Sequence, residues 1–566
     1  MRESSLFSFA LVMACSSALN NVFATYYVGS FMGGDAGCGV RSWAGAALTG
    51  ASFFAAQLLF AVWNAANDPL LGWLSDDGSG ARACCSRRFA AAWGAWAPSR
   101  RRAWVMRWGG VAWCAFFAGA WFPPRAGSSG ALLLAAHFAL SLCLYDGALT
   151  AVEVNHSALL AEMRAPGGGA AGEGGPSSAT LRLRASANAW AGFAAALGSV
   201  TSFPAHEAWA ADCGGGGGGG GGTPLLSAAW RAAGLPWPGH FRAFAVVLAC
   251  LCAAGFFVAA AGIEGGGGAL AAAAAPPPPP RAAGGAAAAA DEEADAGTPW
   301  LRRRDSKPHA LYAEAACGAF LGPYRDFLGA LWALPEARAY IALSSVQAFD
   351  CAFGKSFFAS YLLALCAAAG AQPGWRAQAA LVCASFLVPH LLTLALAPAV
   401  ASRGVVAVLG GLARFRSALA VAAAAATVVL WWAGTRGGGG GGGGSGGAIP
   451  PAALLAAAAC YQLASRVSSE AVCRAMPVLR AAMVDVAERG GVGGAREGPN
   501  RLHCKPAALI GAAEFLPRVA ASLAPAVGFA VVGHASGGAA VWAALLAVPA
   551  ATAGLQVLLI NGMGVA

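Results

Sequence analysis

The stretch WNAANDPLLGWLSDD (residues 63–77) places a carboxylate, Asp68, inside a segment that otherwise has the composition of a membrane-spanning helix. Asn64, Asn67 and Asp68 stand at positions i, i+3 and i+4, so a helix would bring their side chains to one face. A charge near the middle of a bilayer is costly, and ionisable residues in such segments are candidates for function. The rest of the chain decides whether this polar face is a site.

The amino-acid composition indicates that most of the chain lies in a membrane. Of its 566 residues, 58% are hydrophobic and 11% are charged, whereas a soluble domain carries about 25% charged residues. A spanning helix needs about 20 predominantly apolar residues. We therefore predict an all-α membrane protein with twelve transmembrane helices. They are expected near residues 6–33, 45–75, 104–122, 131–163, 185–204, 241–263, 337–367, 377–400, 410–434, 449–486, 507–532 and 538–562.

A low-complexity stretch divides these segments into two sets of six. Residues 264–336 contain runs of Gly and Ala, five consecutive prolines and an acidic cluster, a composition that cannot bury a core. We predict an N-terminal six-helix half (1–263), a cytoplasmic linker (264–336) and a C-terminal six-helix half (337–566). Transporters built from two repeated halves bind their substrates between the halves, near the middle of the membrane.

The positively charged residues indicate the orientation of the chain. Arginines cluster in the loops after the second and fourth segments and in the linker, whereas the loops on the other side hold few. Because cytoplasmic loops are enriched in Lys and Arg, we expect both termini in the cytoplasm, and we favour the plasma membrane. The net charge of +10 has the same origin, and no nucleic-acid partner is indicated. Cys38 and Cys213 fall in two predicted outer loops, where a disulfide would be allowed.

Carboxylates in another apolar segment can complete a site with the polar face of the second segment. Glu153 lies in the fourth segment, and Asp146 lies seven residues earlier, about two helical turns away on a similar face. Carboxylate and amide oxygens suit a hard cation such as sodium, and the same carboxylates could carry a proton. We predict a cation site formed by Asn64, Asn67, Asp68 and Glu153.

Four further charged residues in the apolar segments are candidates for a substrate and translocation pathway, because intramembrane charges mark such pathways. They are Asp146, Asp350, Lys355 and Arg518. For Asp350 and Lys355, a salt bridge between helices is an equally good interpretation.

Five charged residues have spacings or positions that indicate gating or structural ion pairs. Arg466, Glu470 and Arg474 stand at i, i+4 and i+8, a spacing that predicts an ion-pair ladder along one helix. Asp76 and Asp77 end the second segment and face the Arg-rich loop.

Other function classes find no support in the sequence. It contains no Walker A motif, which an ATP-driven transporter would carry. It also lacks the G-x-S-x-G and H-E-x-x-H motifs of hydrolases, and its sixteen cysteines show no zinc-binding spacing. We predict that the chain is not an enzyme and needs no cofactor beyond a coupling ion.

The second segment resembles the second helix of the glycoside–pentoside–hexuronide:cation symporters, the melibiose permease-like branch of the major facilitator superfamily. That helix carries Trp-Asp-Ala-x-Asn-Asp-Pro-x-x-Gly, and the matching residues here are Trp63, Asn64, Ala65, Asn67, Asp68, Pro69 and Gly72. The resemblance implies the major facilitator fold. It also implies a cation site built from this helix and an acidic residue of the fourth helix, where Glu153 falls, and a basic residue in the eleventh helix, where Arg518 falls.

The sequence departs from that family at one position of the cation site, where a negative charge is lost, and at positions that bind sugar. The first aspartate of the family's second helix is Asn64 here, and the sugar-binding aspartate of the first helix has no counterpart. The resemblance therefore supports the cation site better than a sugar-like solute.

A closer resemblance is to an animal member of the same superfamily. It rests on LFAVWNAANDPLLGWLSD (59–76), CLYDGALTAVEVNHSALLAEM (143–163), VQAFDCAFGKSFF (346–358) and VPHLLTLALAP (388–398). These stretches occur in order across both halves.

Together these observations predict a secondary active transporter of a small solute. We expect cation-coupled symport, with sodium or a proton as the coupling ion, by alternating access in a monomer embedded in the lipid bilayer. The alternative from another class is a non-transporting membrane scaffold or receptor-like protein that retains the fold. The missing sugar residues favour that alternative, and the retained carboxylates argue against it.

Overall fold

A computed structural model describes most of the predicted membrane segments. The described residues are 3–32, 48–76, 93, 96–125, 130–163, 178–213, 239–274, 325, 327–329, 331–368, 375–437, 451–489, 506–534 and 538–562. All the secondary-structure elements in this part of the chain are helices. The predicted all-α fold class is therefore confirmed.

The N-terminal half contributes six long helices and one short one. They are α1 (Glu3–Met32), α3 (Gly50–Asp76), α6 (Pro98–Ala120), α7 (Gly130–Glu162), α8 (Ser178–Ser199), α9 (Ser202–Cys213) and α11 (His240–Ala274). Only two residues separate the end of α8 from the start of the short α9, and together these helices cover the fifth predicted segment.

The C-terminal half contributes six long helices. They are α13 (Pro335–Ala368), α14 (Trp375–Arg403), α15 (Val405–Gly437), α16 (Pro451–Arg489), α17 (Pro506–His534) and α18 (Gly538–Gly562). Each of the twelve segments expected from the sequence thus coincides with a helix in the described part of the chain.

Two helices begin earlier than the apolar pattern predicted. The helix α6 begins at Pro98 rather than near residue 104, because proline is favoured in the first turn, where its missing N–H has no intrahelical partner. The helix α8 begins at Ser178 rather than near residue 185. Arg102 and Arg184, which the sequence placed in loops, are consequently helical and buried.

The outer surface of the helices is apolar, as a membrane protein requires. Leu58, Leu132, Leu251, Val421 and Leu558, on five different helices, are each at least 66% exposed, and so many exposed large apolar side chains would be unfavourable in water. In the described part of the chain, six helices are long and apolar enough to cross a membrane by the criterion of one continuous window. The chain is an integral, multi-pass membrane protein.

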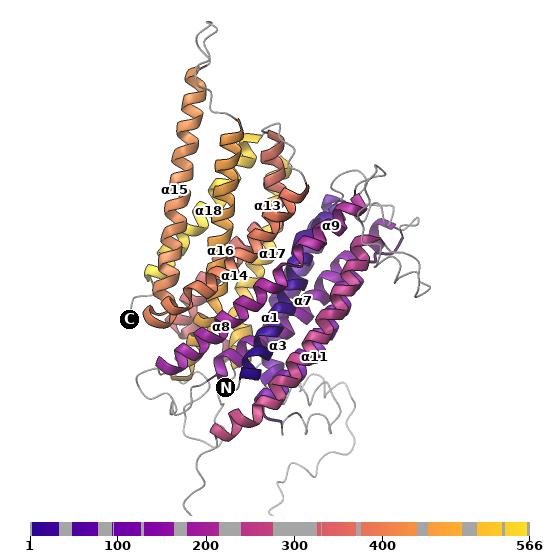
Figure 1. Cartoon of the computed structure of the whole chain (residues 1–566), viewed down its shortest axis with the longest axis vertical. Coiled ribbons are helices and arrows are strands. Elements are labelled where there is room, and N and C mark those ends of the chain that lie inside the picture. The colour runs from indigo at the N-terminus through magenta and orange to yellow at the C-terminus, as the bar shows by residue number, and fades with distance from the viewer. Residues whose placement is uncertain are drawn as a thin grey trace, which may run out of the picture.

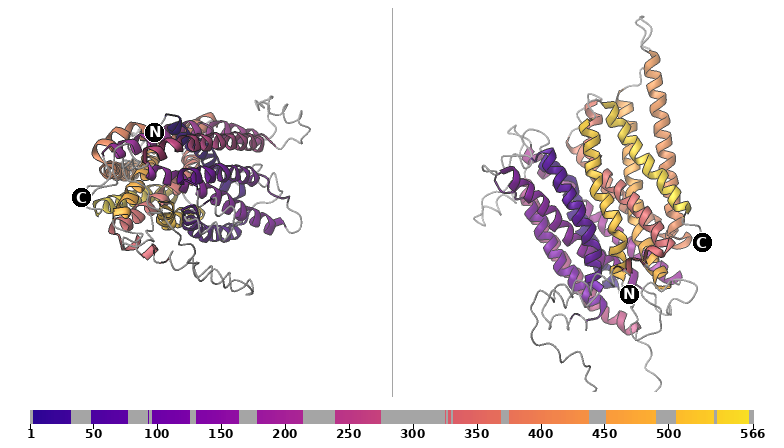
Figure 2. Two further views of the ribbon diagram at one scale, coloured as in Figure 1. Left: turned by 90° about the horizontal axis from the view of Figure 1, so that it is seen from below. Right: turned by 180° about the vertical axis from the view of Figure 1, so that it is seen from behind.

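The most extensive contacts between the two halves join α3 with α17 and α8 with α14, and α7 also contacts α16 and α17. Figure 1 shows the halves close together at the end where α1 begins and farther apart at the opposite end, and Figure 2 shows the same divergence from behind.

At the α3–α17 crossing the two backbones touch. A Cβ atom on Gly72 would overlap the carbonyl oxygen of Ala507, and one on Gly511 would overlap the carbonyl oxygen of Asp68. Small residues permit this close approach of two membrane helices, and the contact fixes Asp68 at the junction of the halves.

Candidate functional site

A cavity of about 390 Å³ lies between the two halves. Its size falls in the range of small-molecule sites, about 300–1,000 Å³. It is lined by α1, α3, α7 and α8 on one side and by α13, α14, α16 and α17 on the other. The charged residues on its walls are Asp146, Glu153, Lys355, Glu470, Arg474, Arg480, Glu514 and Arg518.

Arg518 of α17 lies between two of the predicted cation ligands. Its Nε donates to Asp68 Oδ2 at 2.9 Å, and an Nη atom donates to Glu153 Oε2 at 2.8 Å. Thr150 of α7 donates its hydroxyl to the other oxygen of Asp68 at 2.7 Å. The structure therefore brings Asp68 and Glu153 together, and a guanidinium from the other half joins them.

The two asparagines of α3 flank this ion pair. Asn67 donates through Nδ2 to Asp146 Oδ2 at 3.3 Å, and Asn64 donates through Nδ2 to Ser522 Oγ of α17 at 2.8 Å. The side-chain oxygen of Asn64 is buried and accepts no hydrogen bond from any described residue. Each member of the polar face seen in the sequence therefore makes a contact to another helix.

The charges at this end of the cavity do not balance. Asp68, Asp146 and Glu153 supply three carboxylates, and Arg518 supplies one guanidinium. Asp68 is fully buried, with 0% of its surface exposed, and Asp146 is 6% exposed. Buried charges that lack a counterion are strongly destabilising, so this cluster is suited to one or two small cations.

The donor set fits a proton or a weakly held monovalent cation better than a divalent metal. In the part of the chain that the structure describes, no group of three or more His, Cys, Asp or Glu side chains is arranged to hold a metal ion. Asn64 and Asp146 both line the cavity.

Glu470 of α16 is surrounded by three cations on the opposite wall. Its carboxylate lies 2.8 Å from Arg466, 2.7 Å from Arg474 and 3.3 Å from Lys355 of α13. The first two pairs run along one helix at i, i+4, and Lys355 adds a link to α13. Lys355 and Arg474 line the cavity, whereas Arg466 lies behind it.

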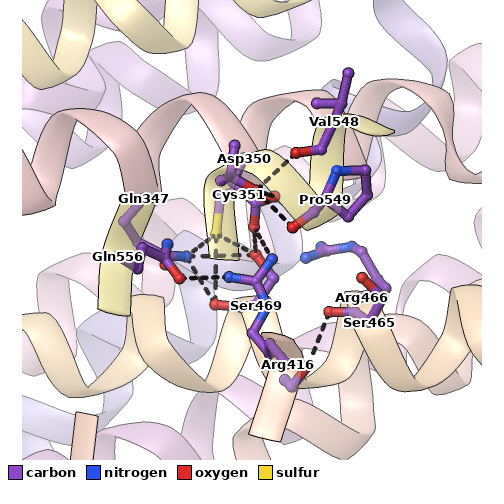
Figure 3. A network of polar contacts seen from close by, with 12 residues as sticks. Gln347, Asp350, Cys351, Arg416, Ser465, Arg466, Ser469, Val548, Pro549 and Gln556 are labelled. Atoms are coloured by element: carbon purple, nitrogen blue, oxygen red, sulfur yellow. Dashed lines mark hydrogen bonds and ion pairs between the residues drawn. The ribbon is translucent and has the colours of Figure 1, made fainter. Parts of the chain in front are cut away.

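Asp350 is not one of the residues that line the cavity. Its carboxylate accepts hydrogen bonds from Arg416 of α15 at 2.6 Å, from Thr552 of α18 at 2.7 Å and from Ser469 of α16. Figure 3 shows this network, in which Gln556 links Arg416 to Gln347. Asp350 is therefore a buried link among four helices of the C-terminal half.

Ion pairs also join helices at the end where α1 begins. Asp76 of α3 contacts Arg102 of α6 at 2.7 Å, and its other oxygen accepts the backbone N–H of Ala508 in α17 at 2.9 Å. Arg184 of α8 pairs with Asp485 of α16. Two of these three contacts cross between the halves and close this end of the cavity. Asp77 and Cys38 lie outside the described residues, as does the side chain of Cys213.

Sequence patterns singled out some of these residues but missed their partners. Arg416 lies with Arg414 near the start of the predicted segment 410–434, and these charges were the available signal. Arg480 pairs with Glu514 at 2.5 Å across α16 and α17, and Arg184 and Asp485 are 301 residues apart. Spacing within one helix could not have paired them.

Comparison with known proteins finds partial relatives. The chain is 35% identical over 153 residues to Transmembrane protein 180 of Mus musculus, which covers 26% of this chain and 24% of that protein. It is 29% identical over 201 residues to the same protein of Gallus gallus, covering 34% and 31% of the two chains. The matches thus span less than a third of the length of these relatives. No family model matches the chain.

Solved structures of transporters match the chain with TM-scores below 0.5. A bacterial homologue of the iron transporter ferroportin, in an outward-facing state, has a TM-score of 0.47 at 12% identity over 99% of this chain and 98% of that one. A proton:xylose symporter of the major facilitator superfamily has a TM-score of 0.49 at 13% identity, over 99% and 96% of the two chains.

Proposed function

We propose that the chain is a secondary active transporter that moves a small solute through the central cavity by alternating access, in symport with a cation. The observation that carries this proposal is the unbalanced cluster of Asp68, Asp146 and Glu153 around one guanidinium, Arg518, on the wall of a cavity between two halves. A membrane scaffold has no use for buried carboxylates that lack a counterion.

Asp146 is the carboxylate through which a cation would act. Asp68 and Glu153 contact the Arg518 guanidinium, whereas Asp146 accepts a hydrogen bond from the neutral amide of Asn67. A proton or sodium ion at Asp146 would reduce the excess negative charge. Because a ligand favours the state that it binds better, the cation would favour conformations in which this cluster is buried from water.

The conformation supports an alternating-access cycle with one end closed. The polar contacts of Arg184 and Asp76 with the opposite half lie at the end where α1 begins. If both termini are cytoplasmic, as the arginine-rich loops indicate, this state faces outward. The same proposal places the protein in the plasma membrane and couples transport to a cation, as the resemblance to the melibiose permease-like symporters implies.

The test is uptake by proteoliposomes that contain the full chain. Radiolabelled glucose, succinate and glycine betaine are supplied with an imposed inward proton gradient, an inward sodium gradient or no gradient. We expect one gradient to drive uptake, and Asp146→Asn to abolish the gradient dependence. Arg107→Gln is the matched control, because Arg107 pairs with Glu264 on α11 and does not line the cavity.

Two other outcomes are informative. Gradient dependence that persists unchanged in Asp146→Asn would contradict the role of this carboxylate. If folded wild-type protein shows no uptake of any solute under either gradient, and its apparent Tm responds to neither sodium nor pH, the scaffold alternative is the better one.

A further inference from the structure

The cavity wall formed by α13 and α16 carries an excess of positive charge that cation coupling does not use. Lys355, Arg466 and Arg474 surround a single carboxylate, Glu470, which is 1% exposed. Three cations and one carboxylate leave two uncompensated positive charges. Clusters of this kind are costly to bury, so they need a counterion, from either the protein or a ligand.

Several hydrogen-bond donors in this cluster have no partner among the described residues. They are Nε and one Nη atom of Arg466 and Nε of Arg474, all buried. Buried donors without an acceptor are uncommon, because each one loses its hydrogen bonds to water. Lys355 and Arg474 reach the cavity, with 16% and 19% of their side chains exposed. A ligand in the cavity can therefore meet both.

The opposite wall carries the opposite charge. Asp146 and Glu153 of α7 line it, and Asp68 lies behind them. Three carboxylates and Arg518 give one end of the cavity two excess negative charges. Three cations and Glu470 give the other end two excess positive charges. A neutral sugar would compensate neither end, whereas a cation at one and an anionic group at the other would compensate both.

We infer that the transported solute carries a carboxylate or a similarly compact anionic group, and that Lys355 and Arg474 bind this group. This inference rests on the proposed transport function and names its substrate class. The anionic group can belong to a small organic anion that travels with a separate cation. It can also belong to a zwitterion whose own cationic group lies near Asp146.

The experiment measures binding to the purified full chain in detergent, at constant ionic strength. Apparent Tm is followed as succinate, glycine betaine, glucose or choline is added. Lys355→Gln and Arg474→Gln each remove one cation and leave Glu470 with two partners, so both variants are expected to fold. Lys355→Arg keeps the charge, and Arg107→Gln is again the control outside the cavity.

Succinate or glycine betaine is expected to raise the apparent Tm of the wild type, since a ligand that binds only the folded state stabilises it. Lys355→Gln and Arg474→Gln should each weaken the apparent affinity about tenfold or more, because they remove a charge-assisted hydrogen bond. Lys355→Arg keeps the positive charge and should retain most of the affinity. A larger response to succinate identifies an organic anion, and a larger response to glycine betaine identifies a zwitterion.

Stabilisation by glucose alone would overturn the inference, as would no response to either carboxylate. Equal carboxylate affinity in the wild type, Lys355→Gln and Arg474→Gln would also overturn it. These outcomes differ from failure of the transport proposal. Carboxylate binding without gradient-driven uptake would support the anion site and reject the transport proposal. Gradient-driven uptake of glucose without carboxylate binding would support transport and reject the anion site.

Discussion

Arg518 of α17 and Asp68 of α3 form an ion pair across the junction of the two halves, with Nε 2.9 Å from Oδ2. The two residues are 450 positions apart in the chain. The ion pair lies beside the crossing where Gly511 contacts the Asp68 carbonyl oxygen. Asp68 therefore takes part in both the ion pair and the close backbone contact. Any motion that separates α3 from α17 must break or stretch this pair.

The first prediction concerns the loss of that guanidinium. In Arg518→Gln, the fully buried Asp68 and the half-buried Glu153 lose their counterion, and removing one partner of a buried ion pair costs about 3–5 kcal/mol. Arg518 itself is partly exposed to the cavity, with 22% of its side chain accessible, so we expect the lower end of that range. The measurement is a fall in the apparent Tm of the detergent-purified protein.

The matched control for this prediction is the double variant Arg518→Gln/Asp68→Asn. Removing both charges should recover part of the lost stability, because the desolvated carboxylate is gone. If single and double variants unfold at the same temperature, then Asp68 and Arg518 are not energetically coupled.

The second prediction separates a structural carboxylate from one in the cavity. Asp350→Asn should destabilise the protein by about 3–5 kcal/mol, because Arg416 loses a buried ionic partner. The effect of sodium or pH on apparent Tm should persist, since Asp350 does not line the cavity. Asp146→Asn should behave in the opposite way, with a smaller loss of stability and a reduced response to the cation.

The contrast between these two variants decides whether the assignment is right. If Asp350→Asn removes the response to the cation while Asp146→Asn leaves it intact, the cation acts in the C-terminal half and the roles given to these residues are reversed.

The sequence predicted the helices well because each spanning segment is a continuous apolar run, a local pattern. It also predicted that Asn64, Asn67 and Asp68 share a face, because that depends only on helical spacing. Which residue meets that face depends on how the halves pack, so Arg518 could be named as a candidate but not as the partner of Asp68. Arg416 was missed although it interrupts an apolar run, because the pattern offered it no partner within its own helix.

The third prediction tests the close crossing of α3 and α17. In Gly511→Val the added side chain would overlap the Asp68 carbonyl oxygen, so the halves should be driven apart at this end. A reporter cysteine at Ala508, which is fully buried, should then react faster with a maleimide. A cost of about 1.4 kcal/mol to the closed state would change the labelling about tenfold.

Two features make this assay interpretable. All native cysteines other than the buried Cys15, Cys114, Cys252 and Cys351 are first replaced by serine, including the exposed Cys250 and Cys460. Gly411→Val is the control, because nothing lies within 4 Å of a Cβ atom at Gly411. Labelling that rises equally in Gly411→Val would mean that any added bulk loosens the bundle, and the crossing would have no special role.

The fourth prediction concerns the ion pair that joins α8 to α16 at the same end. Arg184 and Asp485 belong to opposite halves, and both are buried. Arg184→Gln or Asp485→Asn should raise the labelling of the Ala508 reporter, because breaking a buried pair leaves one charge uncompensated. The charge swap Arg184→Asp/Asp485→Arg should lower the labelling again, but not to the wild-type value.

Arg184 also donates to the backbone oxygens of Ala161 at 2.5 Å and Met163 at 3.2 Å, and an aspartate cannot donate to them. Full recovery in the swap would show that these backbone contacts, which lie within the N-terminal half, contribute nothing to closure. No recovery would contradict the prediction that an ion pair of either polarity closes this end.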